Sequence, residues 1–508
     1  MSVADFVSVS YAIERELSTV SEFAKVTAFP IRSGEFIPTR NFDNANEARD
    51  DRFDTEDDLL SLDGNASFDR VWRPGVFDDF IAGGMFNSWV ELNNRKNYLW
   101  KENAGNTALE AEITNVDGAS ATYTVTAGTA FAAGDLVFMT GFTNAANNGL
   151  KVTQTGSDGT TVIVSGVVVD ETPPAGAEIK FVGRQFAAGD LALSGNVFTD
   201  SNASPYDFTA LNLPAGIPIK IGGEGAAFQY DTAAVNDVVT VTSWSNGSFE
   251  VEDTLPNFAG DAGAGKTIRI FFAEYLVPGT TATTFTWQTV IPRKTGGDKI
   301  RRLVGQHPSE VRLSSRARDR FTLSCQMQGL GFKENLPDLR GAGEANLIRP
   351  RFRRSIRALD GGNRVFMDGT YVFRELAIRS SELTLNPNLL PVDVEGCESY
   401  LDMEASKQSA MLSGDCHFRS NVWHEKYEGN QTFKFRRVIP HGDGAYVADW
   451  ARAQLIQLSD PIPESGNQVI VSYEFKATPD DAVKAAGGIN PFFMMSRFPY
   501  ADGFTQLC

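Results

Sequence analysis

The chain has 508 residues, of which 42% are hydrophobic and 22% charged, as expected for a soluble globular protein of two to four domains. Its formal net charge of -18 argues against a sequence-specific DNA-binding protein, which needs a basic face for phosphates. No apolar run approaches the roughly 20 residues of a membrane span, and the N-terminus lacks the basic and apolar regions of a secretory signal.

The first distinctive segment is an acidic run at residues 47–63, EARDDRFDTEDDLLSLD. It lacks the glycine and the closing glutamate of an EF-hand loop, so it does not indicate a calcium site. We expect it to be a solvated loop.

Residues 67–89 read as a strand that passes through Pro74 into a short helix, with Gly83 and Gly84 expected as the C-terminal cap. One apolar stripe recurs at helical spacing, formed by Phe77, Phe80, Ile81 and Gly84. A helix of roughly eight residues does not persist alone in water, so it must lie on a sheet. Asp78 and Asp79 have no partner base in the sequence, and we expect them to face solvent or a neighbouring subunit.

Between about residues 105 and 275 the chain is rich in Thr, Val, Ala, Gly and Asn and poor in Lys and Arg. Hairpin signals separate short β-branched runs, at Asn148–Gly149, Asp158–Gly159 and Asn246–Gly247. The sequence FAAGDL occurs twice, at residues 131–136 and 186–191. We therefore predict two small, all-β, immunoglobulin-like modules, residues 105–186 and 187–275.

After residue 275 further strands are expected, the clearest within residues 310–332. There Phe321, Leu323, Cys325 and Met327 alternate with polar residues, as in a half-buried strand. Other strands are predicted within residues 283–292, 371–391, 409–420, 432–438 and 467–479. Residues 443–455 are predicted to form a second helix, since Val447, Trp450, Ala451 and Leu455 would share one face.

The fold class that follows is mainly β, an antiparallel sandwich or barrel with a short flanking helix. Residues 1–104 and 276–508 are expected to form one discontinuous core domain. The two modules interrupt this core at a loop, where an insertion costs little.

The sequence offers no catalytic, cofactor-binding or metal-binding residues. Cys416, His417 and His424 lie near one another, but their spacing matches no zinc motif, and the four scattered cysteines are expected to be free thiols. His441 and Asp443 could serve acid–base chemistry but have no identified nucleophile. The glycine-rich segments 222–228 and 262–270 are not phosphate loops, because the second leads into a strand and not a helix.

A block of arginines near residue 350 has two interpretations. It contains Arg349, Arg351, Arg353, Arg354 and Arg357. It could be a solvated loop, or it could contact the acidic runs of a second copy in a self-assembling protein. In the second case, replacing Arg353 and Arg354 with Glu should impair assembly.

Several of these motifs together resemble the tail tube proteins of bacteriophages with long, non-contractile tails. In the first half the resemblance rests on an acidic, arginine-containing segment, a strand, an FDD-containing helix closed by Gly-Gly, and a tryptophan: residues 50–52, 66–73, 77–79, 83–84 and 89. In the second half, RLSSRARDRFTLSCQMQGLGF, ELTLNPNLLP, SAMLSGDCHFRSNVWHEKYEG and PESGNQVIVSYEFKA are similar to successive strands of that family. The chain departs from the family pattern at residues 80–82 and in its long insertion.

The resemblance implies a non-enzymatic, structural virion protein of the tail, made in the host cytoplasm. Six copies would form a ring, and stacked rings would form the tube through which DNA is ejected without sequence-specific binding. The implied partners are further copies of the chain and other tail proteins, such as the tape measure, terminator and distal tail proteins. The modules would lie outside the tube, where they could contact the host surface.

Two other functions remain open from the sequence. The modules could make the chain an adhesin that recognises a cell surface or receptor. Alternatively, the chain could be a tail-associated glycan hydrolase, if two carboxylates about 5 to 10 Å apart line a cleft.

Overall fold

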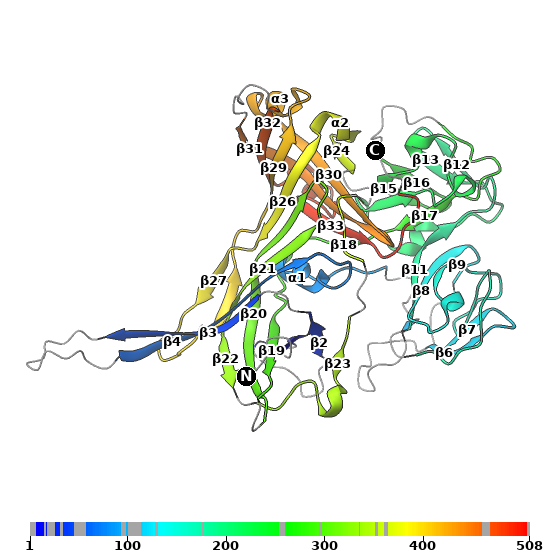
Figure 1. Cartoon of the computed structure of the whole chain (residues 1–508). Coiled ribbons are helices and arrows are strands. Elements are labelled where there is room, and N and C mark those ends of the chain that lie inside the picture. The colour runs from blue at the N-terminus through cyan, green and yellow to red at the C-terminus, as the bar shows by residue number, and fades with distance from the viewer. Residues whose placement is uncertain are drawn as a thin grey trace, which may run out of the picture.

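The computed structural model of the chain describes residues 7–14, 17, 26–30, 34–44, 57–92, 98–99, 113–126, 131–174, 177–252, 260–293, 297–334, 336–350, 354–359, 364–459 and 468–504. The fold is mainly β, with large antiparallel sheets and four short α-helices in the described ranges (Figure 1). Among these residues no helix is long and apolar enough to cross a membrane.

The core is built from both ends of the chain. Its strands are β1 (Ser8–Ile13), β2 (Val26–Phe29), β3 (Gly34–Asn44), β4 (Asp57–Val71), β18 (Glu274–Leu276), β19 (Phe285–Ile291), β20 (Lys299–Arg316), β21 (Thr322–Gly329), β22 (Gly331–Glu334), β23 (Leu347–Ile348), β24 (Arg364–Met367), β25 (Thr370–Tyr371), β26 (Ile378–Asn386), β29 (Ser409–His417), β30 (Thr432–His441), β31 (Gly444–Ser459), β32 (Ile470–Ala477) and β33 (Phe493–Phe498). The hairpin of β27 (Leu389–Val392) and β28 (Asp402–Ala405) pairs separately, and the helices are α1 (Asp78–Gly84), α2 (Phe373–Leu376), α3 (Val422–Glu428) and α4 (Asp481–Ala485).

One antiparallel ladder runs through the core in the order β3–β4–β21–β20–β26–β29–β32–β31–β30–β24. Two long strands leave this ladder part-way along their length. The first half of β20 pairs with β19 and β22, and the first half of β31 pairs with β33. Each of these two strands thus pairs with one set of neighbours along its first half and with another set along the rest. The sheet therefore folds over one large apolar cluster, which includes residues of helix α1.

Helix α1 lies where the sequence predicts a docked helix. Phe80 is fully buried, and its ring stacks on that of Trp287 with the centroids 5.5 Å apart. The two glycines are the last helical residues and do not form the predicted cap, which is at Met85. They are needed because β20 approaches closely: a Cβ at Gly83 would lie 2.8 Å from the Pro308 ring, and one at Gly84 the same distance from Val311.

The strand predictions of the second half are largely confirmed. Leu323, Cys325 and Met327 are buried along β21, as is Phe321 directly before it, while Gln326 on the opposite face is exposed. Strands also form at β19, β26, β29 and β32 within the predicted ranges, and β30 covers the predicted range 432–438 and continues to His441. The prediction for residues 371–391 is correct only from Ile378, because α2 interrupts the segment.

Two local predictions are wrong. Residues 443–455 are not a helix but most of strand β31. Residues 57–63 are not a loop either, since they form the outer part of β4, paired with β3, while residues 47–56 of the same acidic run lie outside the described ranges.

The inserted segment forms two sheets of its own beside the core, a large one and a three-stranded one in the order β10–β7–β6 (Figure 1). Its strands are β5 (Tyr98–Leu99), β6 (Ile113–Asp117), β7 (Thr122–Val125), β8 (Asp135–Thr140), β9 (Gly149–Val152), β10 (Thr161–Ile163), β11 (Glu178–Gln185), β12 (Leu191–Ser194), β13 (Val197–Asp200), β14 (Pro218–Ile221), β15 (Val238–Ser245), β16 (Ser248–Val251) and β17 (Arg269–Phe272). The main sheet runs β12–β13–β16–β15–β14–β17–β11–β8–β9, so the β11–β17 pair joins the two predicted modules. The division of the insert into two immunoglobulin-like modules, residues 105–186 and 187–275, stays a prediction.

The two FAAGDL copies adopt the same turn. Asp135 donates its backbone N–H to the carbonyl of Ala132 at 3.1 Å, and Asp190 donates to Ala187 at the same distance. The glycine of each copy has positive φ, +93° at Gly134 and +85° at its counterpart, which only glycine adopts without strain. The repeat is therefore a repeated turn that starts a strand in each module.

The insert packs tightly against the core through an apolar cluster. Val238 and Phe271 of the insert lie in one buried group with Phe366, Val438 and Phe498 of the core. The C-terminal segment after β33 adds to this contact, because the ring of Tyr500 stacks on Phe138 with centroids 4.3 Å apart. The insert thus covers one face of strands β30, β31 and β33.

Candidate assembly surfaces

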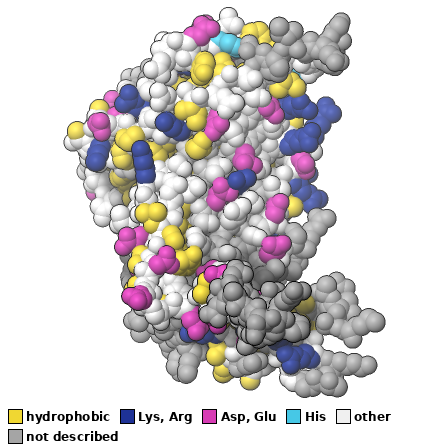
Figure 2. All heavy atoms as spheres, turned by 90° about the vertical axis from the view of Figure 1, so that its left-hand side faces the viewer, with side chains coloured by type: hydrophobic (Ala, Val, Ile, Leu, Met, Phe, Trp, Pro, Cys, Tyr) yellow, Lys and Arg dark blue, Asp and Glu magenta, His cyan; other side chains and the backbone are white. Residues whose placement is uncertain are grey.

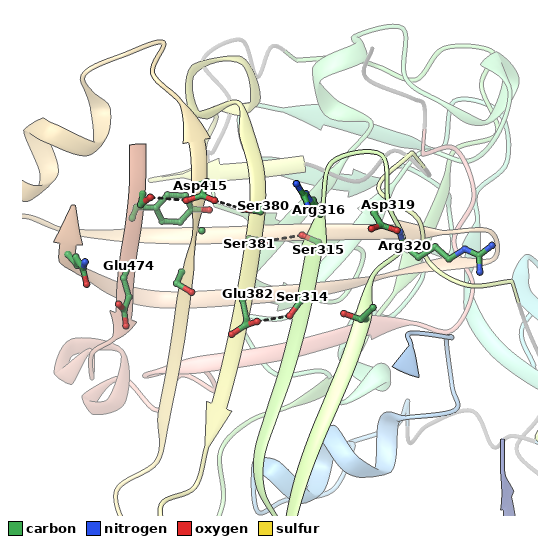
Figure 3. A pocket seen from close by; sticks show the side chains of 16 residues that line it. Ser314, Ser315, Arg316, Asp319, Arg320, Ser380, Ser381, Glu382, Asp415 and Glu474 are labelled. Carbon is green, nitrogen blue, oxygen red and sulfur yellow. Dashed lines mark hydrogen bonds between the residues drawn. The ribbon is translucent and has the colours of Figure 1, made fainter. Parts of the chain in front are cut away.

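A polar groove of about 580 Å³ crosses the outer face of β20, β26, β29 and β32 (Figure 3). Strand register aligns its side chains in two rows. One row is Thr322, Ser314, Glu382, Ser413 and Glu474, and the other is Arg316, Ser380, Asp415 and Ser472. The two rows are two residues apart along each strand, so all their side chains lie on the same face of the sheet. Hydroxyl and charged side chains therefore alternate across this face.

Hydrogen bonds hold the groove's carboxylates in place. Ser314 donates to Glu382 at 2.7 Å, and Ser380 and Ser472 both donate to Asp415, at 2.9 and 2.8 Å. These bonds fix the positions of Glu382 and Asp415 on the sheet face.

A buried guanidinium supports the groove from beneath. Arg437 on β30 donates to the hydroxyl of Ser315 at 2.8 Å and also to that of Ser381. Burial lowers the pKa of Arg437 to about 10, so the group is still a cation at neutral pH. Its charge lies directly below the row of serines.

The groove brings together three carboxylates that the sequence could not single out. Glu382 and Glu474 lie in one row, two strands apart, which places their Cβ atoms about 10 Å from each other. Asp415 lies on the strand between them. The spacing falls near the range that the glycan hydrolase hypothesis requires.

An arginine turn closes one end of the groove. It consists of Arg316, Arg318 and Arg320, at the junction of β20 and β21, and all three residues are exposed. Ala317 donates its N–H to the Arg379 carbonyl at 2.8 Å, and Asp319 donates to the Arg316 carbonyl at 3.1 Å, so the backbone of the turn is fixed. Within the described residues, none of these three guanidiniums forms an ion pair.

A β arm projects from the opposite end of the core (Figure 1). It consists of the outer parts of β3 and β4, residues 40–44 and 57–63, together with the β27–β28 hairpin. Leu62 donates its N–H to the Glu398 carbonyl at 2.7 Å, which ties the hairpin to β4. Large apolar side chains are exposed along the arm: Phe42, Leu59, Leu60, Leu390, Val394 and Leu401 are 39–59% accessible. On the side from which the arm projects, apolar side chains otherwise lie scattered among polar and charged ones (Figure 2).

Helix α1 contains a buried charge cluster, and the prediction that Asp78 and Asp79 face solvent or a neighbour is wrong. Asp78 is 5% exposed, accepts a hydrogen bond from Tyr446 at 2.7 Å and pairs with Arg497 at 2.6 Å. Asp79 accepts a hydrogen bond from Tyr11 at 3.0 Å. Both carboxylates therefore anchor the helix to distant strands.

Arg497 extends this cluster to the junction with the insert. It also bonds Glu274 at 2.7 Å, and the other oxygen of Glu274 pairs with Lys180 of β11 at 2.7 Å. Burial would raise the pKa of Glu274, but the two cations outweigh it and hold the pKa below its usual range. By contrast, burial raises the pKa of Asp79, although the bond from Tyr11 opposes this.

The other candidate residues do not form a site. Cys325, Cys397 and Cys416 are free, and among the described residues no group of three or more His, Cys, Asp or Glu side chains could hold a metal. Arg349 pairs with Glu344, while residues 351–353 of the arginine block lie outside the described ranges. The segment 262–270 leads into strand β17, as predicted.

A comparison with known protein families finds no family model that matches the chain, and a search of curated proteins finds no significant match. The geometry of the surfaces described above therefore carries the functional argument.

Proposed function

We propose that the protein is a structural subunit that assembles into the tail tube of a long-tailed bacteriophage, without catalysis. The observation that carries the proposal is the β arm, which holds Leu59 and Leu60 out in solvent at 39% and 59% accessibility. An exposed, elongated apolar hairpin is an aggregation hazard in a monomer, and it is expected where a partner covers it. A second copy of the chain is the partner that requires no further protein.

The sheet also offers edges for side-to-side contacts. Among the described strands, the core ladder ends at β3, which pairs there with β4 alone, and at β24 with the two-residue strand β25. An edge strand can pair with an edge of a neighbouring chain, and repetition of such a heterologous contact closes a ring. Rings joined through the arms would make a tube. The antiparallel core and the insert agree with a tail-tube domain carrying outward immunoglobulin-like modules.

Electron microscopy of the purified, concentrated protein tests this proposal. We expect rings or tubes, and we expect Leu59→Asp with Leu60→Asp to leave single rings or monomers. Val167→Asp is the matched control, because Val167 is 74% exposed on the insert and lies away from the arm. Wild-type protein that remains monomeric at high concentration would refute self-assembly.

Host-surface adhesion by the insert is the second candidate. The insert has its own large apolar cluster and sheet, so it presents a broad, independent surface. Specific binding of the whole protein to host cells, combined with no self-assembly, would favour this function over the tube.

The groove keeps glycan hydrolysis as a third candidate, since Glu382, Asp415 and Glu474 line it together. Release of reducing sugars from host glycans, abolished by Glu382→Gln and by Glu474→Gln, would favour it. Assembly that is unchanged in the same two variants would show that the groove carboxylates are not needed for the tube.

A further inference from the structure

We propose that the acidic arm of one copy docks on the arginine turn of the next copy, so that the subunits add head to tail along the tube. This inference rests on the proposed self-assembly and names the two surfaces that make its axial contact. Both surfaces lie on the core and not on the insert.

The arginine turn is built to receive anions. Arg316, Arg318 and Arg320 are exposed within five consecutive residues, and Asp319 is the one carboxylate among them. Two further arginines adjoin the turn through their backbones. Arg357 forms an isolated antiparallel β-bridge with Arg320, and the Arg379 carbonyl accepts a hydrogen bond from the Ala317 N–H. A guanidinium is weakly hydrated and forms bidentate hydrogen bonds with carboxylates. A cluster of exposed arginines is therefore able to bind an acidic protein surface.

The arm has the complementary charge. Within the arm, residues 40–44, 57–63 and 389–405, the only cationic side chain is that of Arg40, which lies over the Phe332 ring. The carboxylates of the same ranges are Asp43, Asp57, Asp58, Asp63, Asp393, Glu395, Glu398, Asp402 and Glu404. Opposite fields on two surfaces steer them together and fix their register.

The two surfaces lie at opposite ends of the same strands. Arg316, the first arginine of the turn, pairs with Ser380 near the start of β26. The chain then runs along β26 and continues into β27 of the arm (Figure 1). From Ser380 to Val392 it spans about 40 Å at roughly 3.3 Å per residue. Complementary surfaces at opposite ends form a heterologous contact that propagates along an axis.

Apolar residues accompany the charges at both ends. The arm exposes Leu59 and Leu60, and the other end exposes Leu359 beside the turn, together with Phe418 and Val469 at the ends of β29 and β32. Leu359 follows Ala358, whose N–H bonds the Asp319 carbonyl at 3.0 Å. An apolar centre within a charged rim is the usual composition of a specific protein interface.

Charge reversal tests this contact. The arm variant carries Asp57→Lys and Asp58→Lys, the turn variant Arg316→Glu and Arg318→Glu, and a third chain carries all four changes. Each reversed surface alone repels its partner, so we expect tube yield to fall at least tenfold in the first two variants. The four-fold variant restores opposite charges in every contact, and its yield should recover toward that of the wild type. Glu224→Lys with Asp231→Lys on the insert is the charge-matched control, expected to assemble normally.

The readouts are tube mass by sedimentation and the axial repeat by electron microscopy. We expect a repeat of about 40 Å, and a wild-type yield that falls as salt shortens the Debye length from about 8 to 3 Å. Normal assembly of both single-surface variants, or no recovery in the four-fold variant, would overturn the proposed contact while leaving self-assembly intact. Absence of any wild-type assembly would instead refute the proposed function. Mixing the arm variant with the turn variant should restore tubes in which the two chains alternate. The lysines of one arm then meet the glutamates of the other chain's turn, and the unchanged arm meets the unchanged turn as in the wild type.

Discussion

Replacing Arg497 with Met should strongly destabilise the core, because Arg497 is the cation shared by two buried carboxylates. Asp78 is 5% exposed and Glu274 is fully buried. After the replacement Glu274 keeps Lys180, but Asp78 keeps only the hydroxyl of Tyr446. Removing one partner of a buried ion pair costs about 3–5 kcal/mol. The Arg497 side chain is itself 17% exposed, so we expect the lower end, about 3 kcal/mol.

Urea and thermal unfolding followed by tryptophan fluorescence measure this loss. Trp89 reports directly, since the Arg497 guanidinium lies 4.5 Å from its ring. An unfolding entropy of about 2.1 cal/mol/K per residue gives roughly 1.1 kcal/mol/K for the whole chain, so Tm should fall by about 3 °C. If the core unfolds separately from the insert, the same loss lowers its Tm further, because fewer residues melt together.

Arg452→Met is the matched control. Arg452 is exposed on β31, and within the described residues its guanidinium donates one hydrogen bond, to the Pro479 carbonyl at 3.5 Å. Loss of this side chain should therefore change stability by less than about 0.5 kcal/mol. Adding Asp78→Asn to Arg497→Met removes the uncompensated charge and should recover part of the stability. If Arg497→Met is no less stable than Arg452→Met, the charge cluster does not anchor α1.

Three further predictions concern other parts of the chain. Phe80→Ala should destabilise the core by about 3–5 kcal/mol in urea unfolding, because Phe80 is fully buried against Trp287, and a loss below 1 kcal/mol would contradict this packing. Burial lowers the pKa of Lys220 to about 8 from 10.5, so between these pH values the unfolded chain holds a proton that the folded protein has released. Wild-type stability should therefore rise relative to Lys220→Met from pH 8 to pH 10, and a flat difference in Cm would refute the burial of the amine. Deleting residues 105–275 should give insoluble protein, because it uncovers Phe366 and Val438, and a companion deletion with Phe366→Gln and Val438→Thr should be more soluble on sedimentation.

Strands with one buried face were the most predictable elements. In β21 the alternation of Phe321, Leu323, Cys325 and Met327 with polar residues matches one apolar and one solvated face. The position of α1 was also predictable, since its stripe of apolar residues has one sheet to face. In both cases the spacing of apolar residues within one short segment is enough to identify the face that is buried.

Strand β31 was not predictable, because it is buried on both faces. Residues 444–450 are all buried: Tyr446, Ala448 and Trp450 join the main core cluster, while Val447 packs with the insert. A strand covered on both sides has no alternation, so apolar residues at helical spacing arise by chance. Its second covering layer is about 200 residues away in the sequence.

The misread role of Asp78 has the same origin. Two adjacent aspartates on a short helix indicate a solvated face when only the local sequence is considered. The partners of Asp78, Tyr446 and Arg497, come from the last strands of the core, and the partner of Asp79, Tyr11, comes from its first strand. The groove carboxylates were equally hidden, because Glu382, Asp415 and Glu474 belong to three separate strands whose register sets their spacing.

The insert and the assembly surfaces can be tested separately, because they lie on different parts of the core. The insert covers β30, β31 and β33, and its removal exposes an apolar face of the subunit itself. Loss of tubes after such a deletion would therefore report damage to the subunit as readily as a role in assembly. The arm and the arginine turn consist of exposed side chains, whose charge can be reversed without opening the core. Recovery of assembly by a second reversal, in a chain that keeps its insert, separates a failed contact from a failed fold.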